Sequence, residues 1–322
     1  MLILTVRLNL FLSLYYNMSE RRDKMTKRKL ARCTGAAVLA LLLALCMTAW
    51  LDTPAYAAPK TSKTIEISPS GDKTGNRDFG QINYYTRQGG YRVRLNPGTY
   101  YINGMLRLNS NTYLDAGGAV IYETQNGAKM VTQPDDRTSI NGAKMHGYSA
   151  VHDITVNGGT WFGSKKYRVG AMVKNGQKNG PNVMNFLHAT NITIKNATVC
   201  NSLNAHLIEL CGVKNGVISG CTLGAYRTSN GELKRDYYEG AAYRGAIQLD
   251  YCGSAANNPV AGAFDGTACR NIKITGNYFW HKTGVQAAPA TRSVSLSRNT
   301  FRCNTPYTGI HYKTSKNKTV KY

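Results

Sequence analysis

Short segments in which apolar and polar residues alternate recur along the C-terminal half of the chain. Each copy begins with Asn, Asp or Ser and runs into a Gly or Asn near its end; the copies are residues 153–161, 191–199, 215–223, 271–279 and 293–301. Alternation with a period of two is typical of a half-buried β-strand that turns a corner. Two of the steps between copies are 24 and 22 residues long, the length of one solenoid coil. The pattern therefore predicts a stack of coils.

Coils of this length, with no helical period in residues 58–322, predict an all-β fold, the right-handed parallel β-helix. The alternative is a β-sandwich of unrelated strands. In every copy, positions four, eight and nine are expected to face inward or to close a corner. Position seven holds small or turn-forming residues that suit a tight bend and a stack of Asn side chains: Gly159, Ala197, Cys221, Asn277 and Asn299. The interval from 215 to 271 equals about two steps with extra residues, which predicts a coil with long loops.

The N-terminal part of the chain has the pattern of an export signal. Basic residues at 27–32 precede a largely apolar run at 36–51, and Ala-Tyr-Ala at 55–57 matches a small-x-small cleavage site. The apolar run is short for a membrane span, although a permanent anchor is the alternative. We therefore expect residues 1–57 to be an N-terminal extension with a secretory signal peptide, and residues 58–322 to be the β-helix domain, secreted or at the cell surface.

The chain of 322 residues has a formal net charge of +23, and residues 58–322 alone keep +18. A field of this strength concentrates polyanions at the surface. For an exported protein the expected partners are acidic polysaccharides, such as polyuronates, or anionic wall polymers. Export, and the lack of a nucleic-acid-binding motif, argue against nucleic acid. The alternative is that Lys and Arg only keep the solenoid faces soluble.

Six cysteines remain after residue 57, and no two of them have the spacing of metal ligands: Cys200, Cys211, Cys221, Cys252, Cys269 and Cys303. At strand positions they are first interpreted as small apolar core residues. Export also permits disulfides, and Cys211 could meet Cys252 on adjacent coils. Connectivity does not follow from sequence.

The first part of the domain resembles a known superfamily. Residues 91–102 lead through 105–114 to 118–121, and this run resembles the opening of pectin-lyase-like β-helix proteins, the superfamily of polygalacturonases and pectate lyases. The Gly-Gly-Thr-Trp end of 153–161 resembles the corresponding polygalacturonase coil. The resemblance covers roughly 62–322 and implies a β-helix with an N-terminal cap. It leaves the chemistry open, because this superfamily includes hydrolases, lyases, esterases, epimerases and non-catalytic spikes or adhesins.

Polygalacturonases carry four signature motifs, Asn-Thr-Asp, a paired Asp-Asp, Gly-His-Gly and Arg-Ile-Lys, and we identify none of the four as a site in this sequence. This departure argues against pectin hydrolysis by the usual residues. The nearest segments are 205–210 and 246–251, which we expect to be second strands of neighbouring coils. They resemble paired strands in a group of secreted β-helix proteins.

These two segments place carboxylates on one face. If Ile208 points inward, Glu209 points outward, and the same parity turns Gln248 and Asp250 outward. Aligning Cys211 with Cys252 would stack Glu209 on Asp250, about 5 Å apart at the backbone. A register shifted by two residues would stack Glu209 on Gln248 instead, with Asp250 diagonal to it.

Two close carboxylates support two mechanisms. One can be held as an acid beside a base, as in glycoside hydrolysis, or both can bind Ca²⁺ that bridges a uronate, as lyases require. The alternative for Glu209 and Asp250 is an outward pair that is solvated or bridged to Lys or Arg. His206 is a third catalytic candidate; its parity points it toward the core, where a satisfied histidine is the other interpretation. Gln248 is a candidate substrate-binding residue.

The insert 224–244 leads directly into the second carboxylate strand, and we expect it to overhang the outward face of that strand. It contains aromatic and basic residues suited to sugar rings and uronate carboxylates: Tyr226, Arg235, Tyr237, Tyr238, Tyr243 and Arg244. Arg244 is the candidate base of a lyase, although a salt bridge to Asp236 or Glu239 is equally ordinary. Candidate subsites on later coils are His281, Lys282, Gln286 and His311.

Residues 315–322 match the start of another coil that the sequence does not complete. An open solenoid end exposes strand edges, so we expect either a truncated product or a last coil covered by another subunit. The sequence as a whole predicts a hydrolase or lyase of an acidic polysaccharide, with a non-catalytic polysaccharide- or wall-binding adhesin as the alternative.

Overall fold

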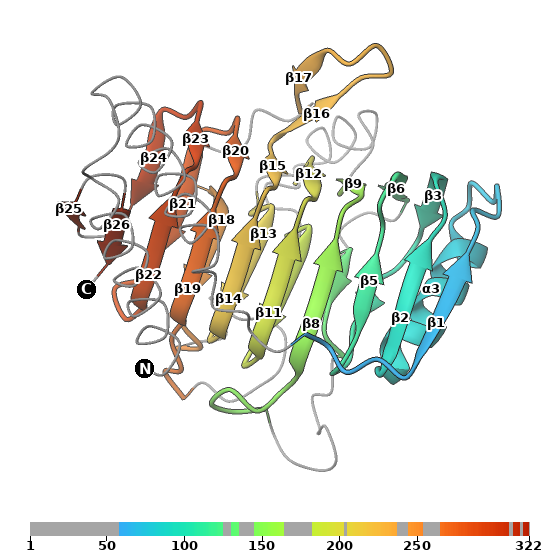
Figure 1. The fold of residues 1–322 in the computed structure, drawn as a ribbon, viewed down its shortest axis with the longest axis horizontal. Coiled ribbons are helices and arrows are strands. Elements are labelled where there is room, and N and C mark those ends of the chain that lie inside the picture. The colour runs from blue at the N-terminus through green and yellow to red at the C-terminus, as the bar shows by residue number, and fades with distance from the viewer. Residues whose placement is uncertain are drawn as a thin grey trace, which may run out of the picture. The chain divides into compact units, whose positions relative to one another are not determined.

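A computed structural model gives the structure of the protein (Figure 1). It describes residues 58–124, 130–134, 145–163, 182–202, 205–236, 244–253, 265–308, 312–315 and 318–321. All of them belong to the second of two compact units, Tyr56–Tyr322. The predicted signal peptide and extension, residues 1–57, lie outside the described residues.

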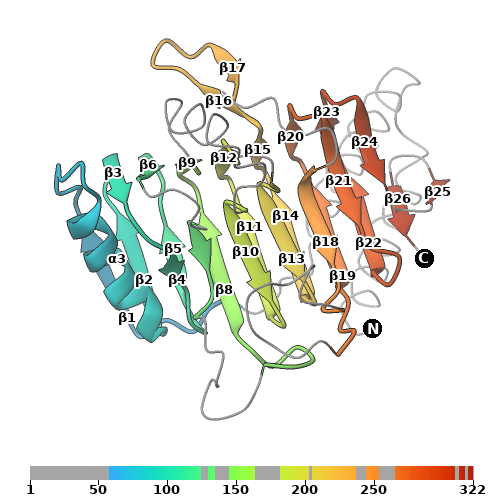
Figure 2. The ribbon, with the colours of Figure 1, turned by 180° about the vertical axis from the view of Figure 1, so that it is seen from behind.

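The described strands form three large sheets and one hairpin (Figures 1 and 2). Sheet A contains, in spatial order, β1 (Lys63–Ile67), β2 (Tyr91–Leu95), β5 (Tyr113–Asp115), β8 (His152–Asn157), β11 (Thr190–Lys195), β14 (Lys214–Ser219), β19 (Arg270–Thr275), β22 (Arg292–Ser297), β26 (Lys318–Lys321) and β25 (Tyr312–Ser315). Sheet B contains β23 (Thr300–Phe301), β20 (Tyr278–Phe279), β15 (Thr222–Leu223), β12 (Thr198–Cys200), β9 (Thr160–Phe162), β6 (Ala119–Glu123) and β3 (Gly98–Ile102). Sheet C contains β24 (Thr305–Thr308), β21 (Thr283–Ala287), β18 (Gly245–Asp250), β13 (Ile208–Cys211), β10 (Met184–Leu187), β7 (Val131–Thr132) and β4 (Leu106–Arg107). The hairpin is β16 (Ala225–Arg227) and β17 (Leu233–Arg235).

The chain passes through sheets A, B and C in turn and then begins the next coil, whose strands pair in parallel with those before. Thr190 of β11 lies opposite Lys214 of β14, and Arg270 of β19 lies opposite Arg292 of β22. These registers reproduce the steps of 24 and 22 residues. The predicted parallel β-helix is therefore confirmed.

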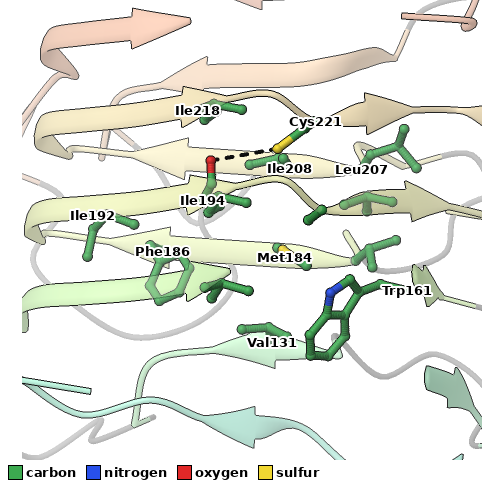
Figure 3. Close-up of a cluster of buried hydrophobic side chains, with 14 of the residues drawn as sticks. Val131, Trp161, Met184, Phe186, Ile192, Ile194, Leu207, Ile208, Ile218 and Cys221 are labelled. Atoms are coloured by element: carbon green, nitrogen blue, oxygen red, sulfur yellow. Dashed lines mark hydrogen bonds between the residues drawn. The ribbon is translucent and has the colours of Figure 1, made fainter. Parts of the chain in front are cut away.

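The interior is filled by side chains from all three sheets. The fourth position of each repeat is buried, as Ile194, Ile218 and Ile274 show. In Figure 3, isoleucines of sheet A face Met184 and Phe186 of sheet C across the core. Each large apolar side chain buried in this way contributes about 1.5–3 kcal/mol. The eighth positions are half-buried or exposed and face outward.

A ladder of side-chain amides stabilises the start of the sheet A strands. Asn215 donates to Asn191 at 3.0 Å, Asn271 donates to Asn215 at 2.8 Å, and Asn191 donates to Asp153 at 2.8 Å. All four residues have positive φ, between 56° and 59°, a conformation that Asn and Asp tolerate better than most residues. This ladder occupies the first position of the repeat and was not predicted. The predicted stack at position seven is present where Asn277 donates to Asn299 at 3.0 Å.

A helix, α3 (Asn76–Gln88), caps the first coil, so the prediction that residues 58–322 contain no helix was wrong. Ile82 and Thr86 are fully buried, and Phe79 packs against the core cluster. The inward positions cover only about three turns and include the polar Thr86, so their helical period is weak in the sequence. The carboxylate of Asp78 accepts bonds from the backbone N–H groups of Ser70 and Tyr101 and fixes the helix to the stack. Across the described part of the chain, no helix has the length and apolar character needed to cross a membrane.

Two predictions about individual coils were also wrong. Because β14 pairs directly with β19, the interval 215–271 is one coil and not the expected two steps, although this coil does carry the long loops that were predicted. Near the C-terminus, β26 runs antiparallel to β22 and to β25. The strand Lys318–Lys321 therefore does not begin another parallel coil, as was expected for 315–322; β26 and β25 add an antiparallel pair to the edge of sheet A instead.

Candidate functional site

A column of polar side chains runs across the outer face of sheet C. Asn185 of β10 lies opposite Glu209 of β13, Glu209 lies opposite Gln248 of β18, and Gln248 lies opposite Gln286 of β21. The residues on either side of Glu209, Ile208 and Leu210, are fully buried in the core. Alternation along a strand therefore turns the column outward, as expected. Strands β13 and β18 belong to neighbouring coils, but each is the third strand of its coil and not the second.

The register between β13 and β18 is the alternative in which Glu209 stacks on Gln248. Asp250 lies opposite Cys211, so the two carboxylates are diagonal neighbours, with Cα atoms roughly 8 Å apart from the strand spacing and rise. The observed register continues an aliphatic stack, because Leu210 meets Leu249. The other register would have placed Tyr251 against Leu210 in the core.

The carboxylate of Glu209 is held by two asparagines. Its Oε2 atom accepts a hydrogen bond from Nδ2 of Asn185 at 2.6 Å and another from Nδ2 of Asn182. Asn182 is itself fixed, because its Oδ1 accepts from the backbone N–H of His206 at 2.9 Å. Glu209 is only 8% exposed although it faces outward. A carboxylate this enclosed has a defined position and is not a freely solvated surface charge.

Asp250 occupies a different environment. Burial raises the pKa of its carboxyl group, against the effect of hydrogen bonds from the backbone N–H of Tyr251, at 2.8 Å, and from the side chain of Gln248. A raised pKa means that Asp250 holds a proton more readily than an exposed aspartate. The enclosed carboxylate of Glu209 is therefore a diagonal neighbour of Asp250, whose carboxyl group holds a proton more readily than an exposed one.

His206 lies at the corner before β13 and is buried. Its Nδ1–H donates to the carbonyl of Gly245 at 2.8 Å, and burial lowers its pKa to about 4, with Arg244 and His281 contributing. His281 is similar: its Nδ1–H donates to Thr283, and burial lowers its pKa to about 4. Both imidazoles are neutral at pH 7. This geometry matches the satisfied core histidine, and a catalytic role for His206 stays a prediction.

Of the other candidates, Arg244 and Lys282 directly precede β18 and β21, and Gln286 lies within β21. Arg244 is exposed, Lys282 is half-buried, and the Oε1 atom of Gln286 accepts from the backbone N–H of Gly245 at 3.0 Å. Gln286 therefore ties β21 to β18. Tyr237, Tyr238 and Tyr243 lie outside the described residues, as do Glu239 and His311.

The described part of the insert is the hairpin β16–β17, which projects beyond the sheets in Figure 1. The ring of Tyr226 makes an edge contact with Phe162 of sheet B, with centroids 5.1 Å apart. This part of the insert therefore lies on the sheet B side. The expectation that it overhangs β18 rests on residues 237–243, outside the described part.

Ca²⁺ takes six to eight oxygen ligands. Within the described ranges, no group of three or more His, Cys, Asp or Glu side chains could hold a metal ion. Asp250 is diagonal to Glu209, and the amide nitrogens of Asn182 and Asn185 occupy the Glu209 oxygen. The described residues do not fit the Ca²⁺ site considered for Glu209 and Asp250.

Sequence reasoning missed Asn182 and Asn185. A signal was present, because Asn185 sits in the alternating segment Met184–Leu187 and precedes Glu209 by 24 residues, one coil step. The expectation that a paired Asp-Asp is missing was wrong, because Asp135 and Asp136 are adjacent in the sequence; both lie outside the described residues.

No protein-family model and no curated protein matches the sequence. Among solved structures, the chain is similar to the Streptococcus pneumoniae surface protein and adhesin PfbA, with 19% identity and a TM-score of 0.51; the match covers 73% of this chain and 61% of PfbA. It is also similar to a family 28 exopolygalacturonase of Yersinia enterocolitica, with 15% identity and a TM-score of 0.48, over 74% of this chain and 48% of the enzyme. The PfbA likeness and the three large, mainly parallel sheets confirm the expected fold, a right-handed parallel β-helix.

Proposed function

We propose that this chain is an exported, carbohydrate-active β-helix protein that hydrolyses an acidic polysaccharide on the outer face of sheet C. One observation carries the proposal: the enclosed carboxylate of Glu209 lies diagonal to Asp250, whose pKa is raised by burial. Glycoside hydrolysis needs such a pair, one group as acid and one as base.

In this reaction Asp250 donates its proton to the glycosidic oxygen as the bond to the anomeric carbon breaks. Glu209 accepts a proton from the attacking water. Inverting hydrolases separate their carboxyl groups by about 6.5–9.5 Å to make room for that water, and retaining ones by about 5–5.5 Å.

The charge of the domain supports an acidic substrate. Residues 58–322 carry a net charge of +18, and Arg244 and Lys282 flank the first residues of the strands that carry the column. Guanidinium and ammonium groups at these positions would bind uronate carboxylates along the chain of the substrate. Gln248, next to Glu209, would contact a sugar hydroxyl.

The test is to incubate the purified protein with polyuronates and neutral glycans, with and without Ca²⁺, and to measure new reducing ends and absorbance from unsaturated products. New reducing ends without that absorbance are expected. Glu209→Gln and Asp250→Asn should each lower turnover about 100-fold or more, whereas Glu66→Gln, an exposed glutamate on β1, should leave it unchanged. Absorbance together with reducing ends would identify a lyase with Arg244 as candidate base.

A protein that binds these glycans but releases no product would identify the alternative, a non-catalytic wall-binding protein. The two asparagines that occupy the Glu209 oxygen favour this alternative, because they would also suit a purely structural carboxylate. Binding that is equal in wild type and Glu209→Gln, with no product from either, would sink the hydrolase proposal.

A further inference from the structure

A second pair of reactive side chains, two thiols, lies beyond the polar column. The Sγ atoms of Cys211, at the end of β13, and Cys252, just after β18, are 3.3 Å apart. Both thiols are fully buried and form a small cluster with Leu187. They come from neighbouring coils and are separated by 41 residues in sequence.

The surrounding backbone leaves room for this contact. Gly212 has φ +62°, and a Cβ atom added there would lie 2.8 Å from the Sγ atom of Cys252. A side chain at 212 would therefore push the two sulfurs apart, besides straining the backbone. The glycine allows Cys252 to approach Cys211 at the carboxyl ends of β13 and β18.

His188, the residue directly after β10, completes the group. Its Nδ1 atom lies 2.9 Å from the carbonyl of Gly147, and its ring also bonds the thiol of Cys252. The hydrogen bond from the Cys211 thiol and the bond from His188 lower the pKa of the Cys252 thiol, although burial opposes them. Cys252 is thereby disposed to react as a thiolate, the nucleophile in disulfide exchange.

The other cysteines after residue 57 have different surroundings. Their sulfur atoms contact backbone carbonyls: Cys200 that of Ala225 at 3.1 Å, Cys269 that of Leu210 at 3.1 Å, Cys221 that of Ser219 at 3.4 Å and Cys303 that of Phe279 at 3.9 Å. Such contacts suit small core residues. Among the described cysteines, only Cys211 and Cys252 have an Sγ···Sγ contact of this kind.

We propose that Cys211 and Cys252 form a disulfide that links two neighbouring coils of the exported protein. The oxidant is an external disulfide, such as a low-molecular-weight disulfide or an oxidised dithiol protein. The Cys252 thiolate attacks one sulfur of this oxidant. The S–S bond of the oxidant breaks, and one thiol leaves. The Cys211 thiolate then attacks the Cys252 sulfur and displaces the second thiol. The two cysteine protons end on the two released thiols.

The disulfide forms as the two coils come together, when Cys252 already contacts His188 and Cys211 but an oxidant can still reach the pair, because both thiols are fully buried once the coils have stacked. Closing the contact needs the sulfurs to approach by only about 1.3 Å, to the usual bond length. The bond would fix the coils that carry Glu209 and Gln248; it rests on the proposed export and is independent of the proposed hydrolysis.

The direct test is chemical. The exported full chain is denatured in guanidinium with N-ethylmaleimide and no reductant, digested, and analysed by mass spectrometry. A linked pair of peptides containing Cys211 and Cys252 is expected, with Cys221 and Cys269 alkylated. Alkylation of both Cys211 and Cys252 would overturn the proposal, and so would a linkage of either one to another cysteine.

A second measurement uses stability. Full chain that is reduced in denaturant and then refolded with oxidised glutathione should melt roughly 5–10 °C higher than chain refolded with a reductant. Cys252→Ser should melt like the reduced protein under both conditions. Cys303→Ser, which removes a half-buried cysteine, should keep the difference. Wild type with the same melting temperature under both conditions would contradict the proposal.

Discussion

Asn185 donates its side-chain amide to Glu209 at 2.6 Å from the equivalent position of the preceding coil. Stacked coils bring residues one step apart in sequence into direct contact, so each position on the outer face is supported by its neighbours before and after. For Glu209 the neighbour before is Asn185 and the neighbour after is Gln248. The coils before and after β13 therefore fix the position of the Glu209 side chain.

We expect Asn185→Ala to destabilise the protein by about 2–3 kcal/mol, because it removes a buried hydrogen bond to a carboxylate. Urea unfolding measures the change. The control is Asn96→Ala, since Asn96 makes a similar bond of 2.9 Å, but to the neutral hydroxyl of Ser68 at an exposed site; about 1 kcal/mol or less is expected there. Equal losses of stability in the two variants would show that the bond from Asn185 to Glu209 stabilises the fold no more than an exposed bond between neutral groups.

Acid should destabilise the fold through its buried histidines. Burial lowers the pKa of His206 from 6.5 to about 4, so the folded state binds a proton less readily than the unfolded state. The contribution of neutral His206 to the free energy of unfolding is complete above pH 6.5 and is lost as the pH falls toward 4. This loss is at most roughly 3 kcal/mol. Urea unfolding of wild type and His206→Gln at pH 7 and pH 4.5 measures it. The variant should lose less stability between these two pH values, and an identical loss would contradict the assignment.

The sequence predicted the stack because its signal is local and repeated: an inward apolar residue such as Ile194 recurs one coil later as Ile218. It also predicted the outward parity of Glu209 and Asp250. It could not decide between the two registers of β13 and β18, because a shift of two residues keeps every side chain on its face. The register depends on whether Leu249 or Tyr251 packs against Leu210, a packing preference that no local pattern expresses.

The Asn ladder of sheet A allows a comparison of backbone strain with hydrogen bonding. Asn215 has φ 59° and bonds both Asn191 and Asn271. Asn215→Gly keeps the backbone conformation and removes the bonds, so a loss of about 1 kcal/mol is expected. Asn215→Ala adds the cost of the left-handed conformation, about 1–2 kcal/mol more. Thermal or urea unfolding of the two variants gives the difference, and equal stabilities would show that the alanine is not strained.

The role of Asp250 as the acid can be tested through the pH dependence of turnover. Because the acid must carry a proton, turnover should fall as pH rises through the pKa of Asp250. The side chain of Gln248 bonds this carboxylate and lowers that pKa, in opposition to burial. Gln248→Leu should therefore move the alkaline limb of the kcat profile to higher pH, even if the maximum falls. Gln286→Leu is the matched control, since Gln286 is the same residue one strand further along and bonds the backbone of Gly245 instead. A limb that moves equally in both variants, or in neither, would remove Asp250 from the role of acid.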